Sequence, residues 1–212
     1  MQPIGRKELW HAQATLALAI FLQLSIGHEL RLGPQYLVAG LELVLLLAIG
    51  FTAPRRHNTA ESVHKAFSTL MIALVSLANA GQLALLTKAL ITGAHLPGKT
   101  LLTNALAIFL TNIIVFGLWY WELDSPGLSG HRKKNQENNF QFPQMESMHE
   151  TTRHWRPTFF DYLYVSLTNG TAFSPTDTMP LSHAAKALMS VQALISLLTV
   201  VLVTARAVNI LA

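Results

Sequence analysis

The sequence contains no cysteine, and this absence excludes disulfide bonds, thiolate metal ligands and cysteine nucleophiles. Charged residues are also scarce: they make up 12% of the 212 residues, whereas soluble domains usually carry about 25%. Glycine-rich phosphate loops, Gly-x-Ser-x-Gly elbows and paired carboxylates are missing, so we expect no enzyme activity and no cofactor. Hydrophobic residues, in contrast, make up 51% of the chain. The composition therefore predicts a multipass membrane protein with a single membrane domain.

The basic residues lie in short connectors between apolar runs, although the pI near 9.6 could by itself suggest nucleic acid. Lipid headgroups and membrane topology explain this distribution better, so we expect the lipid bilayer as a partner and no nucleic acid. His149 and His154 flank a sequence that resembles a zinc-protease motif. Their spacing of five residues places them about 140° apart around a helix rather than on one face. The sequence therefore predicts no metal site.

Five apolar runs are candidate transmembrane helices, and they cover residues 12–27, 36–53, 67–93, 101–121 and 184–212. Because about 20 residues are needed to cross about 30 Å of hydrocarbon, the first run is marginal. It follows Arg6 and Lys7 as a signal peptide would, but no small-residue cleavage site comes after it, so we expect it to be retained. The fourth run ends in an interfacial aromatic belt, Trp119-Tyr120-Trp121.

The only long polar segment, residues 123–158, separates the fourth run from the fifth. We expect a loop whose second half lies along the membrane surface. The predicted fold class is an all-α integral membrane protein with five transmembrane helices and a short re-entrant helix and loop before the last span. Its predicted parts are a four-span bundle (1–122), an interfacial loop (123–158) and a pore-like helix, loop and last helix (159–212).

Residues 159–180 hold the most informative pattern. An aromatic helix is predicted over 159–167, and Pro157 precedes it, where proline favours a helix start. Gly170 and Pro175 then interrupt the helical pattern. A loop at membrane depth must be buried in protein or line a water-filled space, because lipid cannot satisfy its backbone amides. Its carbonyl and hydroxyl groups could replace the water shell of an ion, whereas the alternative is an ordinary interfacial helix and connector. The predicted pore residues are Thr168, Asn169, Gly170, Thr171, Ala172, Phe173, Ser174, Pro175, Thr176 and Asp177.

The segment LYVSLTNGTAFSPTDTMPLSHAAKAL resembles the pore helix, filter and inner-helix start of the potassium-channel superfamily. The positions filled in a similar way are Ser166, Thr168, Thr171, Asp177 and Pro180. The filter itself differs, because residues 172–176 read Ala-Phe-Ser-Pro-Thr where those channels carry Thr-Val-Gly-Tyr-Gly. The fixed φ of Pro175 does not suit the alternating backbone of that filter. The resemblance implies a homo-oligomer of four copies that passes a small cation or solute, without potassium selectivity.

The whole chain is similar to a group of uncharacterised bacterial multipass membrane proteins. The motifs that carry this likeness are LWYWELD at 118–124, FQFPQM at 140–145, WRP at 155–157 and AFSPTDTMP at 172–180. The likeness implies a location in the bacterial inner (plasma) membrane. It implies no activity.

Polar side chains interrupt several of the apolar runs. Glu42 lies near the middle of the second run, where an ionised carboxylate costs about 2.5–3.5 kcal/mol on insertion scales. It is either a hydrogen-bonded structural residue or the protonation site of a small proton-coupled transporter. The third and fourth runs carry polar stripes of the kind that most often join helices and less often line a hydrophilic pathway. These stripes are Ser76, Asn79, Gln82 and Thr87, and Asn104, Thr111 and Asn112.

One face of the last run carries Gln192, Ser196 and Thr199, where an inner helix would meet a pore axis. These residues complete the pore hypothesis. The apolar Ala172 and Phe173 favour a second hypothesis, a non-conducting membrane scaffold or sensor in which the loop is a packed plug.

The positive-inside rule predicts a cytoplasmic N-terminus. With five spans, eleven of the 15 Lys and Arg residues fall on the N-terminal side and four on the other. The pore-like loop would then open to the cytoplasm, whereas potassium channels open it outward. If the long loop and Lys186 are left out, five Lys and Arg residues fall on the N-terminal side and four on the other, and this difference is too small to decide the orientation.

Overall fold

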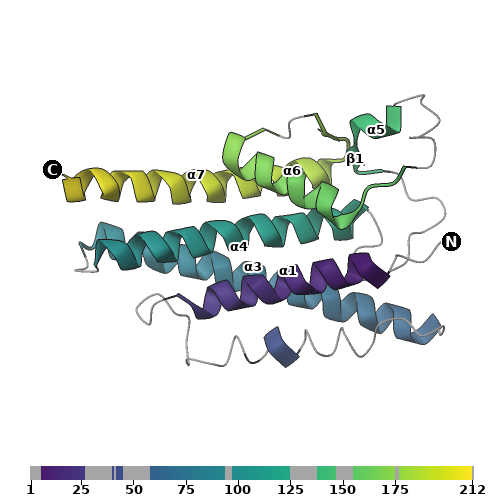
Figure 1. The fold of residues 1–212 in the computed structure, drawn as a ribbon, viewed down its shortest axis with the longest axis horizontal. Helices are drawn as coiled ribbons and strands as arrows, with labels where there is room; N and C mark the ends of the chain where they lie inside the picture. The colour runs from purple at the N-terminus through teal and green to yellow at the C-terminus, as the bar shows by residue number, and fades with distance from the viewer. Residues whose placement is uncertain are drawn as a thin grey trace.

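A computed structural model describes residues 6–26, 40, 42–44, 58–93, 97–124, 138–146, 155–174 and 177–211. These residues are mostly helical, as the sequence predicts (Figure 1). The elements are α1 (Arg6–Leu24), α3 (Asn58–Ile91), α4 (Gly98–Asp124), β1 (Phe140–Gln141), α5 (Pro143–Glu146), α6 (Phe159–Ala172), β2 (Met179–Pro180) and α7 (His183–Leu211).

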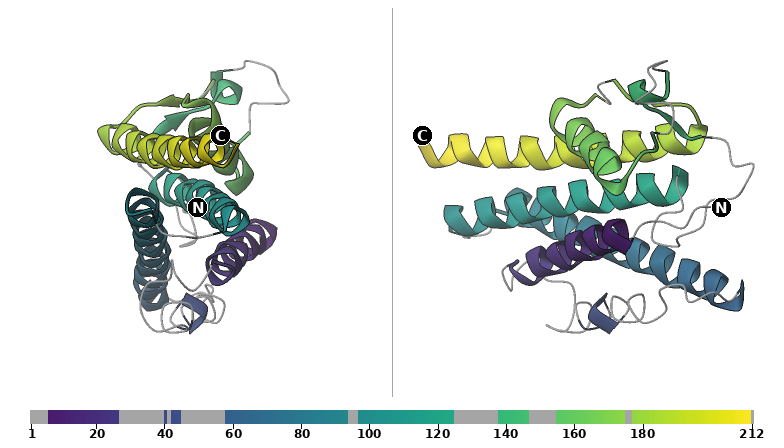
Figure 2. Two further views of the ribbon diagram at one scale, coloured as in Figure 1. Left: turned by 90° about the vertical axis from the view of Figure 1, so that its left-hand side faces the viewer. Right: turned by 45° about the vertical axis from the view of Figure 1, so that its right-hand side comes forward.

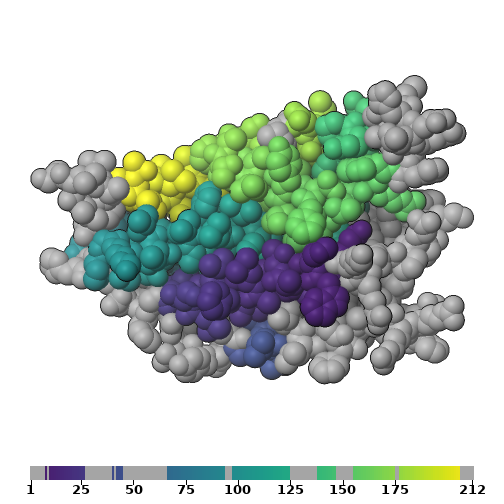
Figure 3. All heavy atoms as spheres, in the orientation of Figure 1, coloured from purple at the N-terminus to yellow at the C-terminus, as the bar shows by residue number. Residues whose placement is uncertain are grey.

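Helix α4 is the centre of this fold. It contacts α1, α3, α6 and α7, and Figures 1 and 2 show α1 and α3 on one side of it and α6 and α7 on the other. A helix that is apolar all round is suited to such a position, and every residue from 111 to 118 is buried. The space-filling view shows α6 and α1 packed over the part of α4 that leads to its C-terminal end (Figure 3).

Three helices are long and apolar enough to cross a membrane: Ala66–Ile91, Gly98–Asp124 and His183–Ala205. They match the third, fourth and fifth predicted runs to within a few residues, apart from the end of the last. Helix α1 begins at Arg6 and is not one of the three. Most of the second predicted run lies outside the described residues. Five spans therefore remain a prediction, whereas three candidate spans are established.

Helices α3 and α4 form an antiparallel hairpin. The chain turns after α3 at Gly93, whose φ of +66° suits glycine. Farther along the pair, Trp119 Nε1 donates a hydrogen bond to Ser76 Oγ at 2.9 Å. A cluster of buried apolar side chains fills the interface near the turn: Leu83, Leu86, Leu101, Ala105 and Ile108.

The polar segment after α4 is tied into the fold through Asp124. This buried carboxylate accepts hydrogen bonds from the backbone N–H groups of Asn139 and Phe140 and, at 2.7 Å, from Tyr162 Oη. Strand β1 follows, and it pairs antiparallel with β2, so that Phe140 faces Pro180. Proline lacks an N–H group, and the edge of a two-stranded sheet tolerates this. Phe140 and Phe142 are buried within the protein, and the position of this segment along a membrane surface stays a prediction.

Gly117 allows α6 to lie close against α4. A Cβ atom added at this position would lie 3.1 Å from the Leu163 Cα atom, and a backbone atom cannot move away cheaply. Gly117→Val is therefore expected to separate α6 from α4 and to destabilise the protein by about 1–3 kcal/mol. Thermal unfolding in detergent measures this effect. Gly40→Ala is the control, because a Cβ atom there meets nothing within 4 Å; equal losses in both variants would contradict the close approach.

Candidate functional site

Helix α6 runs along α4 from the C-terminal end of α4 to its middle. It begins where Asp161 Oδ2 accepts hydrogen bonds from the backbone N–H (2.6 Å) and the hydroxyl (2.8 Å) of Thr158, an arrangement that caps the first turn. Farther along, Ser166 Oγ donates to the Ile113 carbonyl at 2.6 Å. Gly170 then lies against Ile113 and Ser196. The end of α6 is therefore level with the midpoints of the candidate spans in α4 and α7.

The helical part of this segment is longer than predicted. The sequence places a loop from Thr168 onward, but α6 continues to Ala172, so the first five residues of the predicted loop are helical. The hydroxyls of Thr168 and Thr171 donate to carbonyls one turn earlier, at 3.0 and 2.8 Å, and are satisfied within the helix. Gly170 does not break the helix but permits close packing, because a Cβ there would lie 3.2 Å from Ser196 Oγ. The helix closes at Phe173, whose φ is +53°.

A buried hydrogen-bond network joins α6 to α4 and α7. Gln192 Oε1 accepts from Tyr120 Oη at 2.5 Å and from Asn169 Nδ2 at 2.9 Å. Gln192 Nε2 donates to the hydroxyl and the carbonyl of Ser166, at 2.7 and 2.9 Å. Asn169 Nδ2 also lies 3.0 Å from the Met189 carbonyl. All four network side chains are buried, and their bonds replace those that water would otherwise supply.

The face of α7 that carries Gln192, Ser196 and Thr199 is turned into the chain. All three side chains are buried, and Asn112 Nδ2 donates to Ser196 Oγ at 3.0 Å. The prediction that these residues share a face is consistent with their common burial. Their predicted place at a pore axis between copies stays a prediction, because helical spacing groups residues but does not say which neighbour the group contacts.

The predicted pore residues divide into buried and exposed sets. Asn169 and Gly170 are buried within the chain. Thr168 is half-buried, and Pro175 and Thr176 lie outside the described residues. Ser174 is half-buried as well. The exposed members are Thr171, Ala172, Phe173 and Asp177.

A titratable group lies where α1 meets the start of α6. Burial raises the pKa of the Glu8 carboxyl, and the neighbouring Asp161 raises it further, whereas His11 lowers it. His11 also packs against Phe160, with ring centroids 5.0 Å apart. Because the pKa of Glu8 is higher in the folded protein, its contribution favours folding at low pH and is lost as pH rises through the folded pKa.

Glu42 is fully buried, and neither of its carboxylate oxygens has a hydrogen-bond partner within the part of the chain that the structure describes. Most of the run around it lies outside that part, as does the segment with His149 and His154. Among the described residues, no group of three or more His, Asp or Glu side chains could hold a metal ion.

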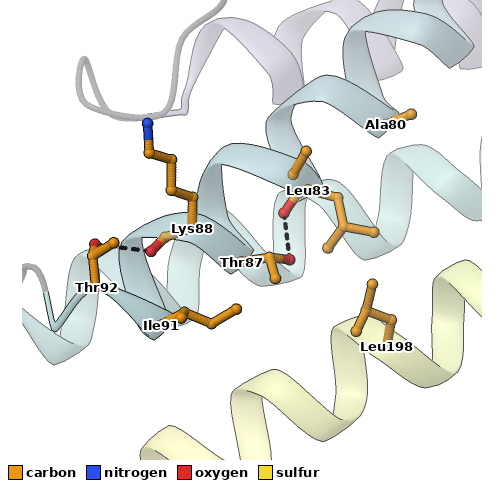
Figure 4. A pocket seen from close by; sticks show the side chains of 8 residues that line it. Ala80, Leu83, Thr87, Lys88, Ile91, Thr92 and Leu198 are labelled. Atoms are coloured by element: carbon orange, nitrogen blue, oxygen red, sulfur yellow. Dashed lines mark hydrogen bonds between the residues drawn. The ribbon is translucent and has the colours of Figure 1, made fainter.

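An open groove of about 510 Å³ lies between α3 and α7. Figure 4 shows Leu83 and Leu198 at its apolar surface, with the Lys88 ammonium directed away from Leu198. The hydroxyls of Thr87 and Thr92 donate to carbonyls of their own helix, at 2.8 and 2.9 Å. The groove therefore presents little polar chemistry to a ligand.

Sequence reasoning missed Tyr120, Tyr162 and Asp124 as members of buried polar contacts. The sequence places Tyr120 in the aromatic belt together with its two tryptophan neighbours. The available signal was spacing, because Tyr120 lies about two turns from Asn112 on α4 and so shares a face with it.

No protein-family model matches the chain, and neither a curated protein nor a solved structure matches it. The fold and the site define its class directly. It is a mostly helical protein with three helices that are long and apolar enough to cross a membrane. A short helix, α6, is held between two of them by a buried polar network.

Proposed function

We propose that the chain is a subunit of a channel-like pore in the bacterial inner membrane, which passes a small cation or other small solute without a potassium-type filter. The observation that carries this proposal is the course of α6. The helix runs along α4 from the C-terminal end of α4 to its middle, where Gly170 lies against Ile113 and Ser196. The chain then leads back to β2, which pairs with β1 at Phe140. A re-entrant pore element would need an outer helix, a half-length helix and an inner helix in this order, and this match supports the proposal.

Self-association is part of the proposal, because one chain has too few helices to enclose a wide pathway. Within the apolar 18-residue stretch of each candidate span, only 22% is buried in α7, against 72% in α4. Large apolar residues of α7, such as Leu194 and Val201, are exposed. We propose that four copies surround an axis, with the exposed Thr171 and Asp177 of each copy facing it. The cytoplasmic N-terminus remains the orientation that the charge count predicts.

Ion flux through reconstituted liposomes tests the pore. Asp177→Ala is expected to lower cation flux several-fold, because a ring of carboxylates attracts cations to a pore. Thr171→Ala is expected to change the flux as well. Its matched control is Thr103→Ala: Thr103 is also exposed and donates to a carbonyl one turn earlier, at 3.0 Å, but it lies on α4 far from the loop. A monodisperse monomer that passes no ions would contradict the proposal.

A non-conducting scaffold or sensor is the second candidate. The burial of Asn169 and Gly170 favours it, because two of the predicted pore positions are packed inside the chain. An oligomer that forms normally but passes no ions would favour this function over the pore.

A small proton-coupled transporter is the third candidate, and it is favoured by the full burial of the Glu42 carboxylate, which has no hydrogen-bond partner among the described residues. Uptake that depends on pH and is abolished by Glu42→Gln would identify this function.

A further inference from the structure

The middle of the α3–α4 pair contains buried oxygen atoms that have no hydrogen-bond partner within the described residues. On α4 they are Thr111 Oγ1 and Asn112 Oδ1, and on α3 they are Asn79 Oδ1 and Gln82 Oε1. The four residues are between 0% and 6% exposed. The Thr111 hydroxyl differs in this respect from other threonine hydroxyls of these two helices, such as those of Thr87 and Thr103, which donate to carbonyls of their own helix.

The four oxygens lie at a similar depth in the fold. Leu83 of α3 and Ile108 of α4 belong to one packed cluster, which fixes the alignment of the two helices. Gln82 precedes Leu83, Asn79 lies about one turn before Gln82, and Thr111 lies about one turn after Ile108. This depth is near the midpoints of the candidate spans Ala66–Ile91 and Gly98–Asp124.

An unpaired buried oxygen costs more free energy than a typical hydrogen bond contributes, and lipid offers no donor. We propose that these oxygens bind internal water molecules and form a hydrated site inside each chain. Water donates and accepts hydrogen bonds, so it satisfies hydroxyl and amide groups alike. None of the four side chains is a carboxylate, so nothing in this group offsets the charge of a cation at membrane depth.

Asn112 connects the hydrated site to the network around Gln192. Its Nδ2 atom donates to Ser196 Oγ on α7, while its Oδ1 atom belongs to the unpartnered group. Water at this point continues the hydrogen-bonded chain from α7 through α4 to α3. The site lies within one chain, so the tests of this proposal do not depend on whether a pore forms between copies.

The first test is Thr111→Val, which removes the hydroxyl and keeps the shape of the side chain. If water bonds to the hydroxyl, the variant is expected to unfold in detergent about 2–4 °C below the parent protein. If the hydroxyl is unpaired in a dry interface, its removal raises the unfolding temperature instead. An unchanged or higher temperature overturns the proposal.

The second test uses the absence of cysteine, which makes an introduced thiol the only one in the chain. Thr111→Cys is expected to react with Ag⁺ and small polar thiol reagents in the folded protein. Val115→Cys is the matched control, because Val115 lies one turn along the same face of α4 and is 1% exposed. Val115→Cys is expected to react only after denaturation. If Thr111→Cys also reacts only after denaturation, the site is dry and the proposal is overturned.

A thermal-shift measurement in sodium, potassium and choline chloride distinguishes water from a cation. Equal unfolding temperatures in the three salts support water. A shift that is specific to sodium or potassium and is lost in Thr111→Val assigns the site to a monovalent cation and overturns the proposal.

Discussion

Gln192→Leu is expected to destabilise the protein by about 2–4 kcal/mol, the largest effect that we predict for a single substitution in α7. Leucine has a similar volume but no polar atoms. The change removes the acceptor of Tyr120 and Asn169 and the donor to Ser166 in one step. These partners are buried, and leucine, which has a similar volume, leaves no space there for a water molecule that could replace the lost bonds. Thermal unfolding in detergent should show a midpoint about 5–15 °C lower.

The control for Gln192→Leu is Ser190→Ala on the same helix. Ser190 is exposed, and its hydroxyl donates only to the Lys186 carbonyl one turn earlier, at 2.8 Å. Its loss is expected to change stability by no more than about 0.5 kcal/mol. A double variant with Asn169→Leu should cost less than the sum of the two single changes, because the two side chains share a bond. Additive costs would show that the two residues act separately.

Asp124→Ala is expected to cost about 2–4 kcal/mol and to release the segment after α4. The carboxylate holds the start of β1 through two backbone N–H groups and holds α6 through Tyr162. Without it these three donors lose their acceptor. Limited proteolysis should then cleave near residues 138–146 faster than in the parent protein, and the unfolding midpoint should fall.

Two further variants separate the roles of Asp124. Asp124→Asn keeps an acceptor oxygen for the backbone groups, so β1 should stay more protected than in Asp124→Ala. Tyr162→Phe removes the bond to α6 alone and is expected to cost about 1–2 kcal/mol. Proteolysis that is unchanged in Asp124→Ala would mean that β1 is held by the packing of Phe140 instead.

The apolar helices could be predicted from the sequence because the length and hydropathy of each run, which do not depend on the rest of the chain, determine where such a helix forms. The third and fourth runs end within three residues of the candidate spans, and the last begins one residue away. The end of α6 could not be predicted in the same way. Gly170 is a helix breaker by intrinsic propensity, and the reason for a glycine at this position is the close approach of Ser196, which lies 26 residues later in the chain.

The candidate site could be predicted only in part, because its contacts join residues that are far apart in the sequence. Spacing alone groups Gln192, Ser196 and Thr199 on one face, but only packing shows that α4 and α6 cover this face. The bond between Asn169 and Gln192 joins residues of two helices, and no periodicity within either helix reports it. The two-residue strands β1 and β2 are too short for a period-2 pattern to be visible.

The bonds of Asn169 and Ser166 have a mechanical consequence. Asn169 is bonded to α7 and Ser166 to α4, so α6 cannot rotate about its own axis without breaking contacts on both sides. The helix therefore links α4 and α7 through hydrogen bonds on both of its sides. A twist of α7 against α4 would therefore have to break some of these bonds or move α6 as a unit up to Phe173, where the left-handed backbone ends the helix.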